Sequence, residues 1–124
     1  MSFPWLDYLV LAEALLQART TLAPEEACCR AAISRAYYAV FCMSRNYLRE
    51  QEGRQVPSRD VHRYVRDAFK KSPDRLHKQI GYDLDRLRSD RNKADYDDSV
   101  ANLDKMANAD VALAHKIIRA FARL

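Results

Sequence analysis

Arg91 is the residue whose place in the sequence most strongly suggests chemistry. It falls within a helical stripe that is otherwise apolar, formed by Leu76, Ile80, Leu84, Leu87 and Ala94. Arginine is seldom buried without a partner, so an anionic group is expected to meet it. One option is a carboxylate from the same helix end or the joint after it, at Asp95, Asp97 or Asp98. The other is a phosphate, whose oxygens match the planar fork of a guanidinium.

Arg35 poses the same question earlier in the chain. It lies in a second helical pattern among small, apolar and aromatic residues, namely Ala31, Ala32, Ile33, Ala36, Tyr37 and Tyr38. A structural ion pair is the favoured interpretation of Arg35, because a guanidinium on an apolar face needs a compensating charge. The aromatic neighbours have the shape to stack on bases, but at helical spacing such residues more often belong to a core.

Other familiar sites have no support in the sequence. The three histidines, His62, His77 and His115, fall on three different predicted helices without the spacing of a metal site, so we predict no metal and no cofactor. Sequence motifs of serine hydrolases, P-loop proteins and dinucleotide-binding folds are missing as well. The cysteines lack CxxC spacing, and we interpret them as small apolar packing residues: Cys28, Cys29 and Cys42.

Five predicted helices must position these residues. Apolar residues recur at helical spacing, and serine and proline residues mark the helix starts. These features predict one helix from Ser2 or Pro4 to about Thr20 and a second from Pro24 to the loop at Glu52. They predict a third helix from Ser58 to about Lys71 and a fourth from Ser72 to about Ala94. A last helix begins between Ser99 and Leu103 and packs Leu103, Met106, Ala109, Leu113, Ile117, Ala120, Phe121 and Leu124. We therefore predict an all-α fold, an antiparallel up-and-down bundle of about five helices, in a single domain spanning residues 1–124.

Composition agrees with this fold and limits the function classes. The chain has 124 residues, 48% of them hydrophobic and 31% charged, with only 2 glycines and 4 prolines. Such scarce turn residues argue against a β-sandwich, a barrel or a glycine-rich phosphate loop. Without an apolar run of membrane length or a signal segment, we predict a cytoplasmic protein with no membrane partner. The net charge of +4 is concentrated in residues 45–93, which can attract phosphates or can simply be a solvated helical surface.

Two segments together resemble the HEPN family, the higher-eukaryote and prokaryote nucleotide-binding domains. Residues 34–41, SRAYYAVF, resemble one helix of that family, and residues 91–98, RNKADYDD, resemble its late motif at the expected separation. The resemblance extends over roughly residues 5–122. It implies a HEPN-like helical bundle that often forms homodimers. It also implies relatives that are metal-independent endoribonucleases, or toxins paired with small nucleotidyltransferase antitoxins.

The resemblance also implies site residues, and here the chain departs from the family pattern. Catalytic relatives carry an arginine, a following polar residue, and a histidine after four to six intervening residues. Arg91 and Asn92 match the first two, but the histidine positions hold Tyr96, Asp97 and Asp98. In toxin relatives a tyrosine two places beyond that histidine accepts nucleotidyl groups; counted from position 96, that place here is Asp98. The implied ribonuclease centre is therefore degenerate.

The chemistry of metal-free RNA cleavage makes this departure important. Cleavage through the 2′-hydroxyl needs a group that transfers protons near neutral pH and a cation that stabilises the phosphorane. Arg91 suits the second role, but Tyr96, with an ordinary pKa near 10, is a poor base at pH 7. The carboxylates of Asp95, Asp97 and Asp98 would also repel RNA phosphates.

Three functions follow from these observations. The leading hypothesis is a homodimeric binding module for nucleotide or RNA, with a degenerate ribonuclease centre, in a nucleotidyltransferase-linked or toxin–antitoxin-like system. The alternative is a divergent metal-independent endoribonuclease that uses Arg91, Asn92 and Tyr96, with a histidine supplied from elsewhere such as His115 or the second subunit. The third is a protein-interaction module in which Arg35 and Arg91 pair with Asp95 or Asp97 as internal struts.

Overall fold

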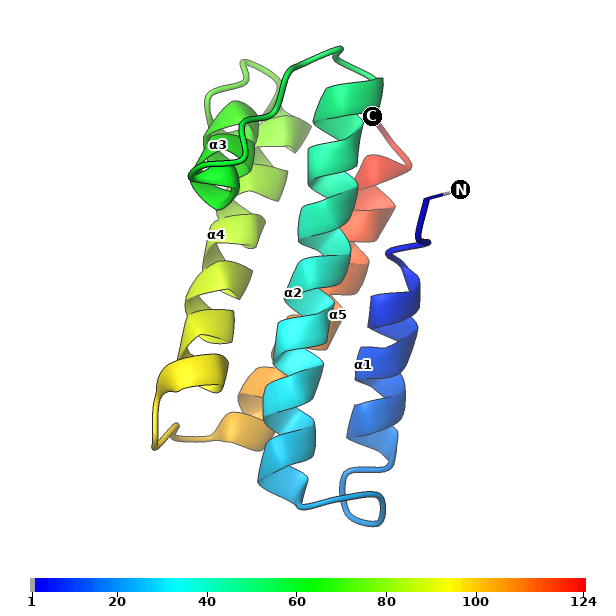
Figure 1. Ribbon diagram of the computed structural model, residues 1–124, viewed down its shortest axis with the longest axis vertical. Coiled ribbons are helices and arrows are strands. Elements are labelled where there is room, and N and C mark those ends of the chain that lie inside the picture. Colours follow the sequence, from blue (N-terminus) through cyan, green and yellow to red (C-terminus); the bar gives the residue numbers. More distant parts are fainter. Residues whose placement is uncertain (1) are drawn as a thin grey trace.

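Five α-helices make up the fold, in a computed structural model that describes residues 2–124 (Figure 1). They are α1 (Asp7–Gln17), α2 (Glu25–Glu50), α3 (Val61–Lys70), α4 (Arg75–Tyr96) and α5 (Leu103–Phe121). No β-strand occurs among the described residues. The predicted all-α bundle of about five helices is thereby confirmed. Within the same residues, no helix is both long and apolar enough to cross a membrane.

Helix α2 lies at the centre of the bundle and packs against each of the other four helices (Figure 1). Its middle section consists mainly of small and apolar residues that are buried on several sides, including Ala32, Ile33, Ala36, Ala39 and Val40. Small side chains let neighbouring helices approach α2 closely from several directions. All three cysteines lie on this helix and are buried and free, which confirms their interpretation as packing residues.

The short helix α3 lies beside the first half of α4 (Figure 1). A close approach at Gly81 of α4 makes this packing tight, since a Cβ atom there would lie 2.6 Å from the backbone nitrogen of Lys70. A side chain at position 81 would therefore force the two backbones apart. Because α3 covers only one end of α4, the later turns of α4, which carry Arg91, pack on α2 instead.

The predicted helix boundaries need correction at several ends. Helix α1 begins at Asp7, not near Ser2, and stops at Gln17. Helix α3 begins at Val61, not at Ser58, because Asp60 has a left-handed backbone (φ 50°) that cannot continue a helix. Helix α4 extends to Tyr96, so that the first two residues of the predicted joint are helical.

The ends of the last two helices also show which sequence signals were informative. Helix α4 begins at Arg75 and not at Ser72, because the side chain of Asp74 caps it by accepting a hydrogen bond from the backbone N–H of His77 (2.9 Å). Helix α5 begins at Leu103, within the predicted window. Its buried face differs from the prediction, because Ala109 is exposed and Asp110 is buried in its place. Leu103 and Ile117 are buried as predicted, whereas Leu124 is exposed.

Candidate functional site

Arg91 points from α4 toward α2 and is buried against two tyrosine rings. Its guanidinium carbon lies 5.4 Å from the ring centre of Tyr37 and 5.2 Å from that of Tyr38. Its Nη1 atom forms an ion pair with the Asp95 carboxylate, one helical turn later, at 3.5 Å. Two cation–π contacts and one carboxylate therefore stabilise the positive charge of Arg91 on this otherwise apolar stripe.

This environment leaves hydrogen-bond donors unused. The Nε atoms of Arg91 and of Arg88, which lies one turn earlier on α4, are both buried and have no hydrogen-bond partner among the described residues. The carboxylate of Asp95 also accepts a hydrogen bond from the Ser34 hydroxyl at 3.4 Å. Buried donors without partners are costly, so an additional acceptor would be stabilised here.

Arg35 joins the same cluster without the ion pair that its position suggested. Its guanidinium lies over the rings of Tyr8 (4.8 Å) and Tyr38 (5.2 Å) and donates to the Ser34 hydroxyl (3.2 Å). No carboxylate of the described chain pairs with it. Arg35 lacks the expected ion pair because aromatic faces also stabilise a guanidinium. We call Arg35, Arg88 and Arg91, with Tyr37 and Tyr38, the arginine–tyrosine cluster.

His62 lies beside this cluster although it comes from a different helix, α3. Its Nδ1 atom is 2.6 Å from the Tyr37 hydroxyl, and its ring stacks on Phe41 at 4.2 Å between centres. Burial and the positive charges of Arg88 and Arg91 lower the pKa of His62 to about 4. Burial likewise raises the pKa of Tyr37. Both groups are therefore uncharged at neutral pH.

The other residues suggested by the family resemblance do not converge with Arg91. Asn92 and Tyr96 are exposed, and the side chain of Tyr96 is among the most exposed apolar ones, at 75%. They are four residues apart on the outer side of α4, whereas Arg91 faces inward. Within one copy of the chain, Arg91 therefore lies on a different face of α4 from Asn92 and Tyr96.

Asp97 and Asp98 contribute their backbone carbonyls rather than their carboxylates. The Arg30 guanidinium of α2 donates to the carbonyl oxygens of Ala94 (2.9 Å), Asp97 (2.6 Å) and Asp98 (3.3 Å). In the described chain neither Asp97 nor Asp98 forms an ion pair. Sequence reasoning gave neither Arg30 nor His62 a role at this site, because only the packing of α2 on α3 and α4 brings them there.

No set of three or more histidine, cysteine or acidic side chains in residues 2–124 is placed to bind a metal ion. The chain was also compared with models of protein families, with curated proteins and with solved structures, and none of these comparisons gave a match.

Proposed function

We propose that this chain is a HEPN-like, homodimeric binding module for nucleotide or RNA, with a degenerate ribonuclease centre, in a toxin–antitoxin-like or nucleotidyltransferase-linked system. The observation that carries the proposal is the charge balance of the arginine–tyrosine cluster. Of its three arginines only Arg91 forms an ion pair, with Asp95, and the buried Nε donors of Arg88 and Arg91 have no partner among the described residues. The SRAYYAVF and RNKADYDD segments supply the cluster's α2 and α4 residues, apart from Arg88.

A phosphate group fits this balance better than another side chain would. Guanidiniums bind phosphate oxygens through paired N–H donors, and an added dianion would offset the excess positive charge. Arg35 and Asp95 are more exposed than Arg91 and form the edge from which such a group approaches. The tyrosine rings keep the guanidiniums in place without neutralising them.

Binding is a better fit than cleavage for this geometry. Asn92 and Tyr96 face away from Arg91, and His62 is held by the Tyr37 hydroxyl. A second candidate function is nevertheless favoured by one observation, the place of His62 near the positive charges of Arg88 and Arg91. In that case His62 would take the proton-transfer role in a metal-independent endoribonuclease, because a bound phosphate would offset those charges and bring the pKa of His62 closer to neutral.

The outer face of α1 supports the homodimer part of the proposal. Leu6, Val10 and Leu11 are exposed there, beside the exposed Phe3, and Asp7 is the main charge among them. A largely apolar exposed face is unusual on a chain with 31% charged residues. A second copy would present the same face, as a two-fold symmetric interface requires.

The test is binding of a fluorescently labelled single-stranded RNA to purified protein, followed by polarisation at several salt concentrations. We expect Arg35→Gln to bind about tenfold more weakly and with a shallower salt dependence than the unchanged chain. Arg49→Gln is the matched control, since Arg49 is exposed on the same helix outside the cluster. Equal binding by both variants, with both folded by circular dichroism, would contradict the proposal.

The same proteins separate binding from cleavage. We expect no RNA cleavage in EDTA by the unchanged chain. Cleavage that is lost in both His62→Phe and Arg91→Lys would establish the second candidate instead. Titration with a small nucleotidyltransferase, followed by size-exclusion chromatography, tests the proposed partner, and an unshifted elution volume would count against it.

A further inference from the structure

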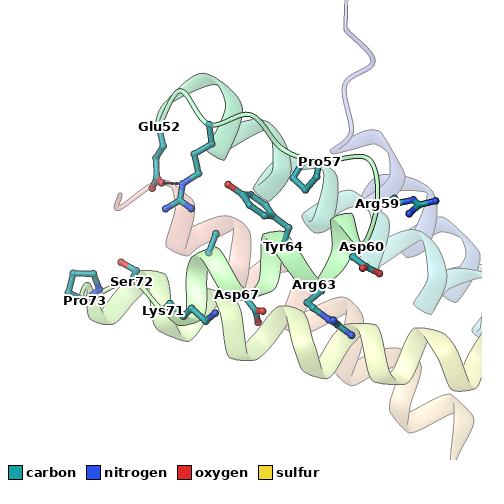
Figure 2. A pocket seen from close by; sticks show the side chains of 12 residues that line it. Glu52, Pro57, Arg59, Asp60, Arg63, Tyr64, Asp67, Lys71, Ser72 and Pro73 are labelled. Atoms are coloured by element: carbon teal, nitrogen blue, oxygen red, sulfur yellow. Dashed lines mark hydrogen bonds and ion pairs between the residues drawn. The ribbon is translucent and has the colours of Figure 1, made fainter.

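The structure contains a cavity that is separate from the arginine–tyrosine cluster. It has a volume of about 660 Å³ and lies between the connection after α2, the outer side of α3 and the connection before α4. Figure 2 shows Tyr64 between the two connections, with Pro57 beside it and Pro73 farther along. This volume is within the usual range for a site that holds a small organic molecule.

The walls of the cavity are fixed by the backbone rather than by a ligand. Gly53 and Asp60 have left-handed backbones (φ 63° and 50°), which turn the connection at both of its ends. The N–H of Arg54 donates to the Leu48 carbonyl at 3.0 Å and so ties the connection to α2. The contact of Gly81 with Lys70 fixes α3 against α4. The cavity is therefore preformed, which lowers the entropy lost on binding.

The charges that line the cavity favour an anionic ligand. Two of its three carboxylates already have cationic partners, because Glu52 pairs with Arg54 (2.8 Å) and Asp67 pairs with Arg66 (3.0 Å). Among the described residues, three lining cations form no ion pair: Arg59, Arg63 and Lys71. Asp60 is the one lining carboxylate that is likewise unpaired. The unpaired lining side chains therefore carry more positive than negative charge.

The arrangement of these groups indicates the shape of the ligand. In Figure 2, Arg59 and Arg63 lie to one side of Tyr64, with their side chains directed away from its ring, while Lys71 and Ser72 lie on the other side. Tyr64, with Pro57 and Ala68, provides an apolar wall. Cations on both sides of an aromatic ring suit a molecule with a planar ring and an anionic group.

We propose that this cavity is a binding site for a small organic phosphate that carries a planar ring, of the size of a nucleoside monophosphate. The ring packs on Tyr64 and the phosphate binds a guanidinium of Arg63 or Arg59, or the Lys71 ammonium. The site goes beyond the function proposed above, because none of its residues belongs to the arginine–tyrosine cluster.

The test uses adenosine monophosphate as the probe, with adenosine and inorganic phosphate as its two separated halves. We expect saturable binding of the monophosphate by isothermal titration calorimetry, and at least tenfold weaker binding of either half. In ¹H–¹⁵N spectra the shifted amides should belong to Tyr64, Ala68, Lys71 and their neighbours. Equal affinity for inorganic phosphate and the monophosphate, or shifts confined to the arginine–tyrosine cluster, would overturn the proposal.

Variants identify the groups that bind. Arg63→Glu is expected to weaken binding at least tenfold, Tyr64→Leu several-fold, and Tyr64→Phe little, because it keeps the ring. Lys78→Glu, an exposed charge change on α4 away from the cavity, is the matched control. The shifts of the cavity amides, not the total binding of the probe, decide this test, which keeps it independent of binding at the arginine–tyrosine cluster. Unchanged affinity in Arg63→Glu together with Arg59→Glu and Lys71→Glu would refute the site.

Discussion

At the scale of single residues, the two buried ionisable groups Arg91 and Asp110 have opposite surroundings: one has partners and the other has none among the described residues. Arg91 is stabilised by two aromatic faces and by Asp95. Asp110 on α5 is fully buried, and neither of its carboxyl oxygens has a hydrogen-bond partner in the described part of the chain. Burial, reinforced by the nearby carboxyl of Asp90, raises the pKa of Asp110. The protonated form of Asp110 is therefore the one that fits the core.

Replacing Asp110 by asparagine should stabilise the protein, and more so as the pH rises. A carboxyl whose pKa is higher in the folded state binds its proton more tightly there than in the unfolded chain. Its contribution is complete below the ordinary carboxyl pKa and is lost as the pH rises through the folded value. Asparagine avoids this loss, so Asp110→Asn should gain about 1–3 kcal/mol at pH 8.5 and less at pH 5.

Thermal unfolding of both proteins at the two pH values measures this difference. Asp83→Asn is the matched control, because that buried carboxylate is paired with Lys116 (3.3 Å) and accepts a hydrogen bond from Gln79 (3.0 Å). It should lose stability at both pH values. An Asp110→Asn protein that unfolds at a lower temperature than the unchanged chain at pH 8.5 would show that the buried carboxylate has a partner.

At the scale of elements, the last turn of α4 depends on α2. The final carbonyls of a helix have no partners within it, and here Arg30 supplies donors to Ala94, Asp97 and Asp98. The Arg30 side chain also pairs with Glu26 at 3.6 Å. Because Asp95 lies within this turn, Arg30 sets the position of the one carboxylate that meets Arg91.

Arg30→Met should therefore loosen the end of α4 while keeping the apolar stem of the side chain. We expect faster amide hydrogen exchange across residues 94–98 and a loss of about 1–2 kcal/mol in the free energy of unfolding. Hydrogen exchange followed by mass spectrometry measures the first effect and denaturant titration the second. Arg49→Met, at the exposed end of α2, should change neither. Unaltered exchange at residues 94–98 in Arg30→Met would show that the turn holds without this guanidinium.

At the scale of the whole molecule, α1 lies at one side of the bundle (Figure 1). It packs on α2 and α5 and leaves its outer face uncovered (Figure 1). On that face Val10 is 65% exposed. A symmetric contact between two such faces would bury apolar surface, with Asp7 as the main charge beside it.

Val10→Glu should abolish the proposed homodimer by placing two carboxylates opposite one another. We expect the unchanged chain to have twice the 14.4 kDa mass of one copy in light scattering, and Val10→Glu to have the mass of one. Leu22→Glu is the control, since Leu22 is 64% exposed but lies beyond α1. A dimer that survives Val10→Glu would place the interface on another face.

How much of the fold could be predicted depends on which physical signals are local. Helical spacing and start signals such as Pro24 and Ser72 are local, and they located all five helices to within a few residues. Backbone reversals at Asp60 and Asn102 carry no comparable signal, since neither residue is a glycine, and the start of α3 was therefore misplaced. On α5 the small residues Ala107 and Ala109 look alike in sequence, and only packing decides that Ala107 is buried.

For the candidate site, the sequence by itself determined that Arg35 and Arg91 lie on helix faces that enter the bundle. A charge on an apolar stripe is visible in sequence because its spacing is fixed by the helix. Only the tertiary structure decided what these charges meet. Tyr8, Arg30 and His62 reach the site from three different helices, and which side chains meet across helices depends on the rotation and crossing of each pair. Spacing along one helix contains no information about that rotation, so the partners of a buried charge appear only once the helices are packed.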